Sequence, residues 1–264
     1  MEQTHIITLI TDFGLRDCYV GALKGSILSV NPNVQIIDVA HTIAKQDVLE
    51  AAYLIKGFYK AFPKGTIHLA VVDPGVGGAR RPILAETRNH FFIGPDNGIF
   101  SYVFEEEHVA QVVHLTASQY FAADISDTFH GRDIFGPVAA QLASDVEPRW
   151  LGKLIDDFVR LPLPQLKTAG NTLAGEVVYV DRYGNLVTNI DLASFYALVK
   201  GKQYTIAAGP DTVASISRNY IDGQPGQLLA LFGCQQTLEL AVNQGSAANK
   251  LGQGRGLKVV VQAV

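Results

Sequence analysis

The chain has 264 residues, a formal net charge of −4, two cysteines and only 17% charged residues. At about 150 residues per domain this length predicts two domains or one large one. The charges are nearly balanced and form no long run of one sign, which excludes a general nucleic-acid binder. The longest apolar runs, residues 6–10 and 67–72, are far shorter than the roughly 20 residues that cross a bilayer, so no membrane span is expected.

The start of the chain and its cysteines indicate a cellular compartment. The first residues carry no basic segment and no small-residue cleavage pattern, so we expect no secretory leader. Cys18 and Cys234 are too few for a disulfide framework or a zinc site, and no other spacing suggests a metal. These features predict a metal-free cytoplasmic protein. Its charged fraction lies below the typical quarter, which predicts surface buried between domains or subunits.

Strand-like and helix-like segments alternate through the first half of the chain. This alternation is typical of βαβ units and predicts an α/β domain. The expected strands are residues 5–10, 34–39, 66–73, 82–87, 90–93 and 111–115, and the expected helices are residues 19–30, 46–62 and 133–144.

The composition changes after Trp150, where the segment LPLP at residues 161–164 indicates a linker. We predict an N-terminal α/β domain over residues 1–158, a linker over 159–171 and a smaller C-terminal domain over 172–264. Gly and Asn separate short strands in that last domain, which predicts an all-β barrel or sandwich. These strands are expected at residues 172–180, 186–190, 203–208, 228–232, 237–241 and 257–264.

A glycine-rich segment follows the apolar strand at residues 67–72. It matches neither classical nucleotide motif, because Arg80 stands where a dinucleotide fingerprint needs its third glycine and no Walker lysine is present. Asp73 directly follows the strand, so its carboxylate is expected at the carboxyl edge of the sheet. Open α/β sheets bind their ligands at that edge, which favours a functional role for this loop.

Two further loops carry candidate polar groups. Asp12 leaves the end of the first strand and could accept both hydroxyls of a ribose, although Asp12 or Asp17 could instead cap the helix that begins near Cys18. His130 lies on a polar loop before a helix, where it faces either a ligand or only solvent. His41 and His68 are interpreted as structural.

The C-terminal half contains turns whose roles the spacing leaves open. Asp181 and Asn185 belong to the segment DRYGN, which reads as a hairpin turn that uses Gly and Asn for positive φ. Whether their side chains also face a ligand is not decided by the pattern. The same two alternatives hold for the turn at Tyr220 and for residues 238–248.

Six segments taken together point to one family. They occur in the order TDFGLRDCYVG from Thr11, VVDPGVGGARR from Val71, GPDNG from Gly94, TFHGRDIFGP from Thr128, VDRYGNLVTNI from Val180 and LELAVNQGSAA from Leu238. With these motifs the chain resembles the S-adenosyl-L-methionine (SAM) hydrolases that form adenosine, also called SAM hydroxide adenosyltransferases. They are relatives of the fluorinating and chlorinating SAM enzymes. Ordered motifs over nearly the whole chain are far more specific than any one of them.

The resemblance implies a fold, a reaction and an assembly. The fold is an N-terminal α/β/α-type domain with a largely parallel sheet and a C-terminal β-barrel domain. The reaction converts SAM and water to adenosine and L-methionine, with SAM as substrate and no cofactor. The assembly is a homotrimer whose sites lie between the first domain of one subunit and the second domain of its neighbour.

The resemblance also implies residue roles. Asp73, Arg80 and His130 match the family's water-handling trio, with Arg81 as a competitor for the arginine role. Asp12 would take the ribose hydroxyls. The contacts to adenine and methionine would come from Asp181, the adenine-edge residue Asn185, the ring-stacking Tyr220, Cys234 in place of the usual Ser, Glu239 and the backbone of Val242.

These roles suggest how water could attack the ribose C5′. Free hydroxide at pH 7 costs about 12 kcal/mol, so we expect Arg80 to stabilise developing hydroxide while Asp73 and His130 orient the water and remove its proton. Three alternatives stay open: halide addition at the same carbon, a SAM or adenosine sensor without chemistry, and a merely structural Asp–Arg–His cluster.

Overall fold

The computed structural model describes residues 5–264 and divides into two compact units, the first ending at Pro162 and the second spanning Leu163–Val264. Each unit has its own hydrophobic core. Within the predicted linker, Leu161 N–H donates to Ser101 Oγ at 2.8 Å in the first unit, whereas Lys167–Ala169 forms a strand of the second.

The first unit is built on a seven-stranded sheet with the order β2-β1-β3-β5-β4-β6-β7. The four strands from β2 to β5 are parallel, and β4, β6 and β7 pair in antiparallel fashion. Its strands are β1 (Ile6–Thr11), β2 (Gln35–Ala40), β3 (Ile67–Val71), β4 (Pro82–Thr87), β5 (Phe91–Pro95), β6 (Val109–Leu115) and β7 (Gly152–Ile155).

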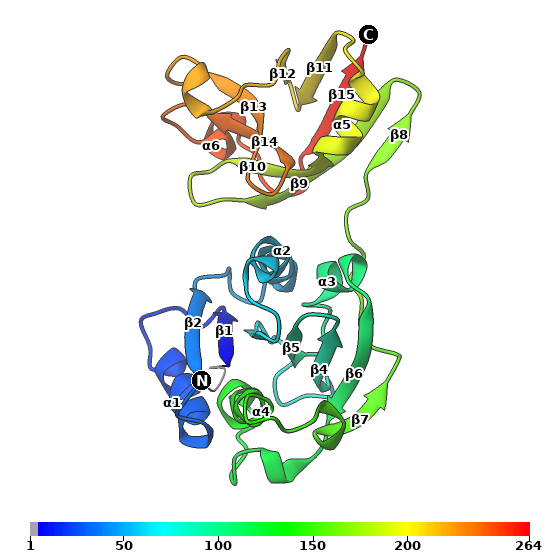
Figure 1. Cartoon of the computed structure of the whole chain (residues 1–264). Coiled ribbons are helices and arrows are strands. Elements are labelled where there is room, and N and C mark those ends of the chain that lie inside the picture. The colour runs from blue at the N-terminus through cyan, green and yellow to red at the C-terminus, as the bar shows by residue number, and fades with distance from the viewer. Residues whose placement is uncertain (1–4) are drawn as a thin grey trace. The chain divides into compact units, whose positions relative to one another are not determined.

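Helices cover both faces of this sheet, so the first unit has three layers (Figure 1). Ile7 and Leu9 of β1 pack in the core shared with α1 and α4, whereas Ile10 packs in the core shared with α2 and α3. The alternation follows from the two-residue period of a strand. The helices are α1 (Tyr19–Val30), α2 (Val48–Phe58), α3 (Ser101–Glu106) and α4 (Gly136–Leu142), with a π-helical turn η3 (Gly131–Phe135) and 3₁₀ turns η1 (Tyr59–Ala61), η2 (Ser118–Tyr120) and η4 (Pro148–Trp150).

The parallel pairing of β1 with β3 determines where the candidate residues lie. Thr11 at the end of β1 is level with Val71 at the end of β3. Asp12 directly follows Thr11 and Asp73 lies two residues after Val71, so both leave the same edge of the sheet. This is the carboxyl edge at which open α/β sheets bind ligands.

Several local expectations need correction. Asp17 does not cap α1, because Cys18 is the N-cap residue and makes no side-chain capping bond. The helix expected from residue 46 begins at Val48, where the Asp47 carboxylate accepts from Glu50 N–H at 3.0 Å, since Gln46 has a positive φ of 64°. The helix expected from residue 133 is entered two residues earlier, through η3.

The second unit is an antiparallel sheet with the order β12-β11-β15-β9-β10-β14-β13, and β8 pairs with β9. A bridge between Ile216 and Ala230 brings the two ends of this order together, so the sheet is nearly closed and barrel-like. The predicted fold class is confirmed. The strands are β8 (Lys167–Ala169), β9 (Thr172–Val180), β10 (Leu186–Asp191), β11 (Tyr204–Ala208), β12 (Asp211–Val213), β13 (Leu228–Phe232), β14 (Thr237–Val242) and β15 (Lys258–Ala263).

The second unit also contains helices that the sequence did not predict. They are α5 (Leu192–Val199), α6 (Ala247–Leu251) and the 3₁₀ turn η5 (Tyr220–Asp222). Asp191 starts α5 by accepting from Ser194 N–H at 2.8 Å, and Ser246 starts α6 by accepting from Asn249 N–H at 3.1 Å. Both residues are ordinary N-caps. The helices that they start are too short to show the hydrophobic periodicity by which a helix is predicted from sequence.

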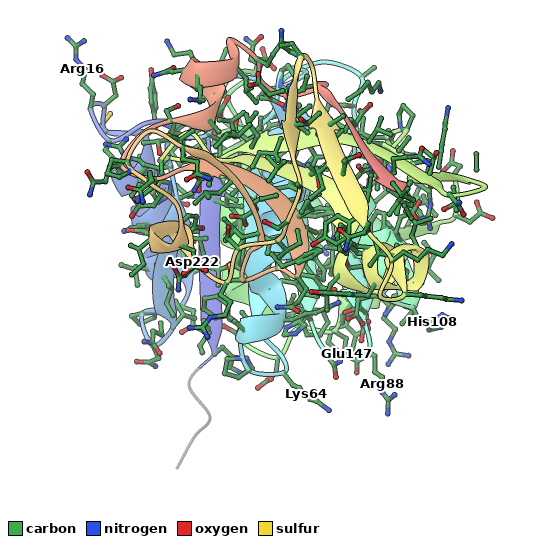
Figure 2. All side chains as sticks on the ribbon, turned by 90° about the horizontal axis from the view of Figure 1, so that it is seen from above. Arg16, Lys64, Arg88, His108, Glu147 and Asp222 are labelled. Carbon is green, nitrogen blue, oxygen red and sulfur yellow. The ribbon has the colours of Figure 1, made fainter. Side chains whose placement is uncertain are left out.

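The side chains of Arg16, Lys64 and Arg88 are exposed and extend outward from the ribbon (Figure 2). Across residues 5–264, no helix combines the length and the apolar character that a bilayer crossing needs.

Candidate active site

A cavity of about 150 Å³ lies at the carboxyl edge of the first sheet. Three of the sequence-predicted residues line it, which brings together the loops after β1, after β3 and before η3. The lining residues are Asp12, Phe13, Gln46, Val71, Asp73, Val76, Thr128, Phe129, His130 and Gly131.

Asp73 and Arg80 form a close ion pair beside this cavity. The guanidinium donates from Nε to both carboxylate oxygens at 2.9 Å and from Nη2 to Oδ2 at 2.5 Å. Only 5% of the Asp73 side chain and 10% of the Arg80 side chain are exposed. The loop between them closes tightly at Gly77, where φ is +73° and a Cβ would lie 2.1 Å from the Asp127 carbonyl oxygen. Any side chain at Gly77 would therefore push this loop away from Asp127.

His130 extends the ion pair to a third group. Its Nδ1 lies 2.7 Å from Arg80 Nη2. A guanidinium only donates, so Nδ1 accepts and the imidazole proton sits on Nε2. Burial, and then the positive charge of Arg80, lower the pKa of His130 below its ordinary value, which favours this neutral form. His130 thus offers an N–H donor at Nε2.

The neighbouring arginine belongs to a different network. Arg81 donates from Nε to Asp96 Oδ2 at 2.8 Å and from Nη1 to Asp157 Oδ1 at 2.6 Å. Of the two candidates for the arginine role, only Arg80 contacts Asp73 and His130. Arg80 itself does not line the cavity but lies behind the two residues that do. Its charge therefore acts on the cavity through Asp73 and His130.

Asp12 reaches the same cavity from the other loop. Its Oδ2 accepts from the backbone N–H of Gln46 at 2.9 Å. Gln46 also lines the cavity, and the sequence analysis missed it, as it did Phe13 and Phe129. The two phenylalanines stand inside the quoted motifs and could have been found there. Gln46 lies outside those motifs and reaches the site through the connection between β2 and α2.

The remaining predicted residues belong to the second unit, where Asp181 and Asn185 form the turn between β9 and β10. Asp181 Oδ1 accepts from the backbone N–H groups of Tyr183 at 2.8 Å and Asn185 at 2.9 Å. Its Oδ2 accepts from Asn185 Nδ2 at 2.8 Å. Gly184 has a φ of +80°, and a Cβ there would lie 2.1 Å from Ser246 Oγ, so the turn requires glycine. The predicted hairpin is confirmed.

Glu239 and Tyr220 form a second polar cluster in this unit. The Tyr220 hydroxyl donates to Glu239 Oε2 at 3.2 Å. Burial raises the pKa of Glu239, and burial together with the Glu239 charge raises the pKa of Tyr220 to about 12. The charge of Asp181 raises both pKa values as well, which puts the turn within electrostatic range of this pair. The charge of Cys234, an exposed free cysteine, also raises the pKa of Tyr220.

Strand β14 carries two of the predicted C-terminal residues. Glu239 lies opposite Val187 in the ladder between β10 and β14. Val242, the last residue of β14, lies three positions further along the same strand. The predicted residues thus divide between the two units. The first-unit set is Asp12, Asp73, Arg80 and His130, and the second-unit set is Asp181, Asn185, Tyr220, Cys234, Glu239 and Val242.

Comparison with known proteins gives concordant results for both units. The SAM hydroxide adenosyltransferase N-terminal domain matches residues 7–152, and the C-terminal domain of the same family matches residues 175–260. A Salinispora tropica protein named (R)-S-adenosyl-L-methionine hydrolase is 34% identical over 266 residues, covering 100% of both chains. An Actinoplanes fluorinase is 26% identical and covers 97% of each chain. The crystal structure of an uncharacterized conserved protein from Thermotoga maritima matches with a TM-score of 0.92 and 32% identity, covering 97% of this chain and 99% of that one.

Proposed function

The chain belongs to the SAM hydroxide adenosyltransferase family, and from this premise we propose that it hydrolyses SAM to adenosine and L-methionine. The carrying observation is the hydrogen-bonded chain Asp73–Arg80–His130, which presents a carboxylate and an imidazole N–H to the cavity that Asp12 also lines. Asp12 would hold the ribose hydroxyls there, next to the carbon that reacts.

The leaving group of this reaction departs without help from the protein. The sulfonium of SAM leaves as a neutral thioether, so no acid is needed to protonate the leaving group. The nucleophile is the difficult part, since free hydroxide at pH 7 costs about 12 kcal/mol. A base that takes the proton while the new C–O bond forms avoids most of that cost.

The hydrogen-bond polarity supports a division of roles within the trio. Arg80 only donates, and the one acceptor nitrogen of His130 is already bonded to Arg80, so Asp73 is the group that can take the proton. His130 Nε2–H orients the water by donating to its oxygen, and the Arg80 charge stabilises the developing negative charge from behind. The water oxygen bonds to C5′, the C5′–S electron pair goes to sulfur, and the water proton passes to Asp73 and then to solvent.

Halide addition is the second candidate, because a fluorinase is among the relatives. Identity favours hydrolysis, at 34% to the named hydrolase against 26% to the fluorinase. The chemistry agrees, since the buried carboxylate of Asp73 would repel an anion placed beside it.

Turnover of SAM in oxygen-18 water containing chloride tests the proposal. Mass spectrometry should find the label in the 5′-oxygen of adenosine. A 5′-chloro nucleoside would overturn hydrolysis in favour of halide addition. SAM that binds in calorimetry but is recovered intact by chromatography would instead identify a non-catalytic binding protein.

We also propose that the protein is a cytoplasmic homotrimer in which each site combines the first-unit set of one subunit with the second-unit set of its neighbour. Exposed apolar side chains support the need for a partner: Leu15 is 73% exposed near Asp12, Tyr183 is 77% exposed in the Asn185 turn, and Ile221 is 80% exposed beside Tyr220. Two free cysteines agree with a reducing compartment.

Subunit mixing tests the shared site. Asp73→Asn and Asn185→Ala variants, each inactive alone, are unfolded and refolded together in equal amounts. Random assembly gives each site one intact set from each subunit in about a quarter of cases, so about a quarter of the activity should return. No recovery in a mixture shown by light scattering to be trimeric would place each site within one subunit.

A further inference from the structure

A second loop, residues 41–46, holds the loop that carries Asp12. Gly14 N–H donates to the His41 carbonyl oxygen at 2.6 Å. At the other end of the loop, Gln46 N–H donates to Asp12 Oδ2 at 2.9 Å. The Asp12 carboxylate and the turn that follows it are therefore both fixed by the same short segment.

The side chain of His41 adds a third attachment. It is buried, with 4% of its surface exposed, and its Nδ1 lies 2.9 Å from Thr11 Oγ1. On the other side of the ring, Nε2 lies 3.0 Å from Asp38 Oδ1. Asp38 Oδ2 is in turn 2.5 Å from Lys24 Nζ. The histidine thus links an ion pair between β2 and α1 to the last residue of β1.

The donors and acceptors along this chain match in one direction. The Asp38 carboxylate lies 3.0 Å from Nε2 without the alignment of a hydrogen bond, and its negative charge favours the ring proton on Nε2. In that neutral ring, Nδ1 accepts from the Thr11 hydroxyl. Thr11 Oγ1 in turn accepts from Phe13 N–H at 3.2 Å. The contacts lead from a solvent-exposed ion pair to the backbone next to Asp12.

The same three groups, carboxylate, imidazole and hydroxyl, occur in nucleophilic hydrolases. Thr11 is not a nucleophile here, because it is 0% exposed and its oxygen already accepts a backbone hydrogen bond. The arrangement holds its loop in place instead of reacting.

The backbone conformation of Gln46 indicates that the segment that holds Asp12 is strained. Its φ of 64° is uncommon for a residue with a side chain. Such strain persists only where the surroundings enforce it, and it concentrates at functional sites. Here the neighbouring Asp47 begins α2 as its N-cap, and the strained residue directs its N–H at Asp12.

We propose that His41, backed by Asp38, is a positioning residue for the ribose subsite. It fixes residues 11–14 so that Asp12, with Oδ2 held by Gln46, keeps its other oxygen oriented for the ribose hydroxyls. This inference rests on the proposed function, in which Asp12 binds the ribose.

The chain offers a matched control for this role. His68 is also buried, and its Nδ1 lies 2.8 Å from Thr8 Oγ1, a threonine of the same strand three residues before Thr11. His41→Phe and His68→Phe each remove one buried Thr–His hydrogen bond and keep a ring of similar size. Only the first of them touches the Asp12 loop.

The readout is ribose recognition, measured by calorimetry with adenosine and 2′-deoxyadenosine, together with kcat and KM for SAM. His41→Phe should reduce the preference for adenosine about tenfold and raise KM about tenfold, with kcat changed less than about threefold. His68→Phe should leave the preference unchanged while lowering thermal stability. Asp38→Asn, which keeps a polar oxygen beside His41 Nε2, should retain more of the preference than Asp38→Ala.

An unchanged preference in folded His41→Phe overturns the inference, as does an equal loss in His68→Phe. If His41→Phe does not fold, the two Asp38 variants decide, and equal preferences in them overturn it. If the wild-type protein prefers adenosine but leaves SAM intact, the proposed hydrolysis is refuted and the positioning role of His41 still stands. A wild-type protein without that preference would end the positioning role alone, whatever its turnover.

Discussion

Acid should destabilise the first unit through one buried histidine. His68 is 0% exposed, and its ring lies 5.1 Å, between ring centroids, from both His90 and Phe92. Burial, assisted by the His90 charge, lowers its pKa from 6.5 to about 3. The folded protein therefore keeps this ring neutral over the whole range in which an unfolded chain protonates it.

The sign and size of the effect follow from this difference. Below pH 6.5 the unfolded state binds a proton at His68 that the folded state does not bind. The contribution of His68 to the free energy of unfolding is therefore fully present above pH 6.5 and is lost as the pH falls toward 3. At 1.36 kcal/mol per unit, the contribution of His68 amounts to a loss of about 2 kcal/mol between pH 7.5 and pH 5.

Urea unfolding followed by circular dichroism at pH 7.5, 6.5 and 5 measures this loss in the wild type and in His68→Phe. The wild type should lose about 2 kcal/mol more than the variant over this range. His90 and His114, whose pKa values burial also lowers, remain in both proteins, so their contributions largely cancel. The unpaired Thr8 hydroxyl of the variant shifts its stability equally at every pH. Losses that agree within about 0.5 kcal/mol would refute the reasoning.

Three further predictions concern the reaction. Asp73→Asn should lower kcat at least about 100-fold while KM for SAM stays within about threefold; equal changes in binding would leave Asp73 only structural. Arg80→Ala should lower kcat about 100-fold. Arg81→Ala should keep kcat but lower thermal stability, because it leaves the buried carboxylate of Asp96 without its arginine partner. The reverse pattern would assign the catalytic role to Arg81 in place of Arg80. Turnover should decrease toward acid pH with a midpoint below pH 6.5, because a protonated His130 Nδ1 can no longer accept from Arg80. His130→Gln should lack this decrease. A midpoint above pH 6.5 would contradict the lowered pKa of His130.

The helices and strands of the first unit were predictable because their apolar residues recur with the period of the secondary structure that they form. α1 occupies the predicted residues 19–30, and β4 the predicted residues 82–87. The sequence analysis put Asp12 and Asp73 each at the end of a strand, and the parallel pairing of β1 with β3 brings both to one edge of the sheet. The family resemblance is confirmed as well.

Irregular segments were less accessible. Asp17 has the side chain of a helix cap but is displaced by Cys18, because capping depends on backbone angles that composition does not specify. The choice between Arg80 and Arg81 had the same limit. Adjacent side chains diverge according to the path of a loop, and this loop turns at Gly77 with a φ of +73°.

The least predictable property of the site is the direction of its hydrogen bonds. Motifs identify a carboxylate, a guanidinium and an imidazole, and these three groups are compatible with either Asp73 or His130 as the base. The contact from Arg80 Nη2 to His130 Nδ1 supports the proposal of Asp73, because a guanidinium only donates and so leaves Nδ1 as the acceptor. At His41 the nearby charge of Asp38 favours the ring proton on Nε2 in a similar way. In both places a charged neighbour influences the proton of a histidine, which spacing in the sequence does not reveal.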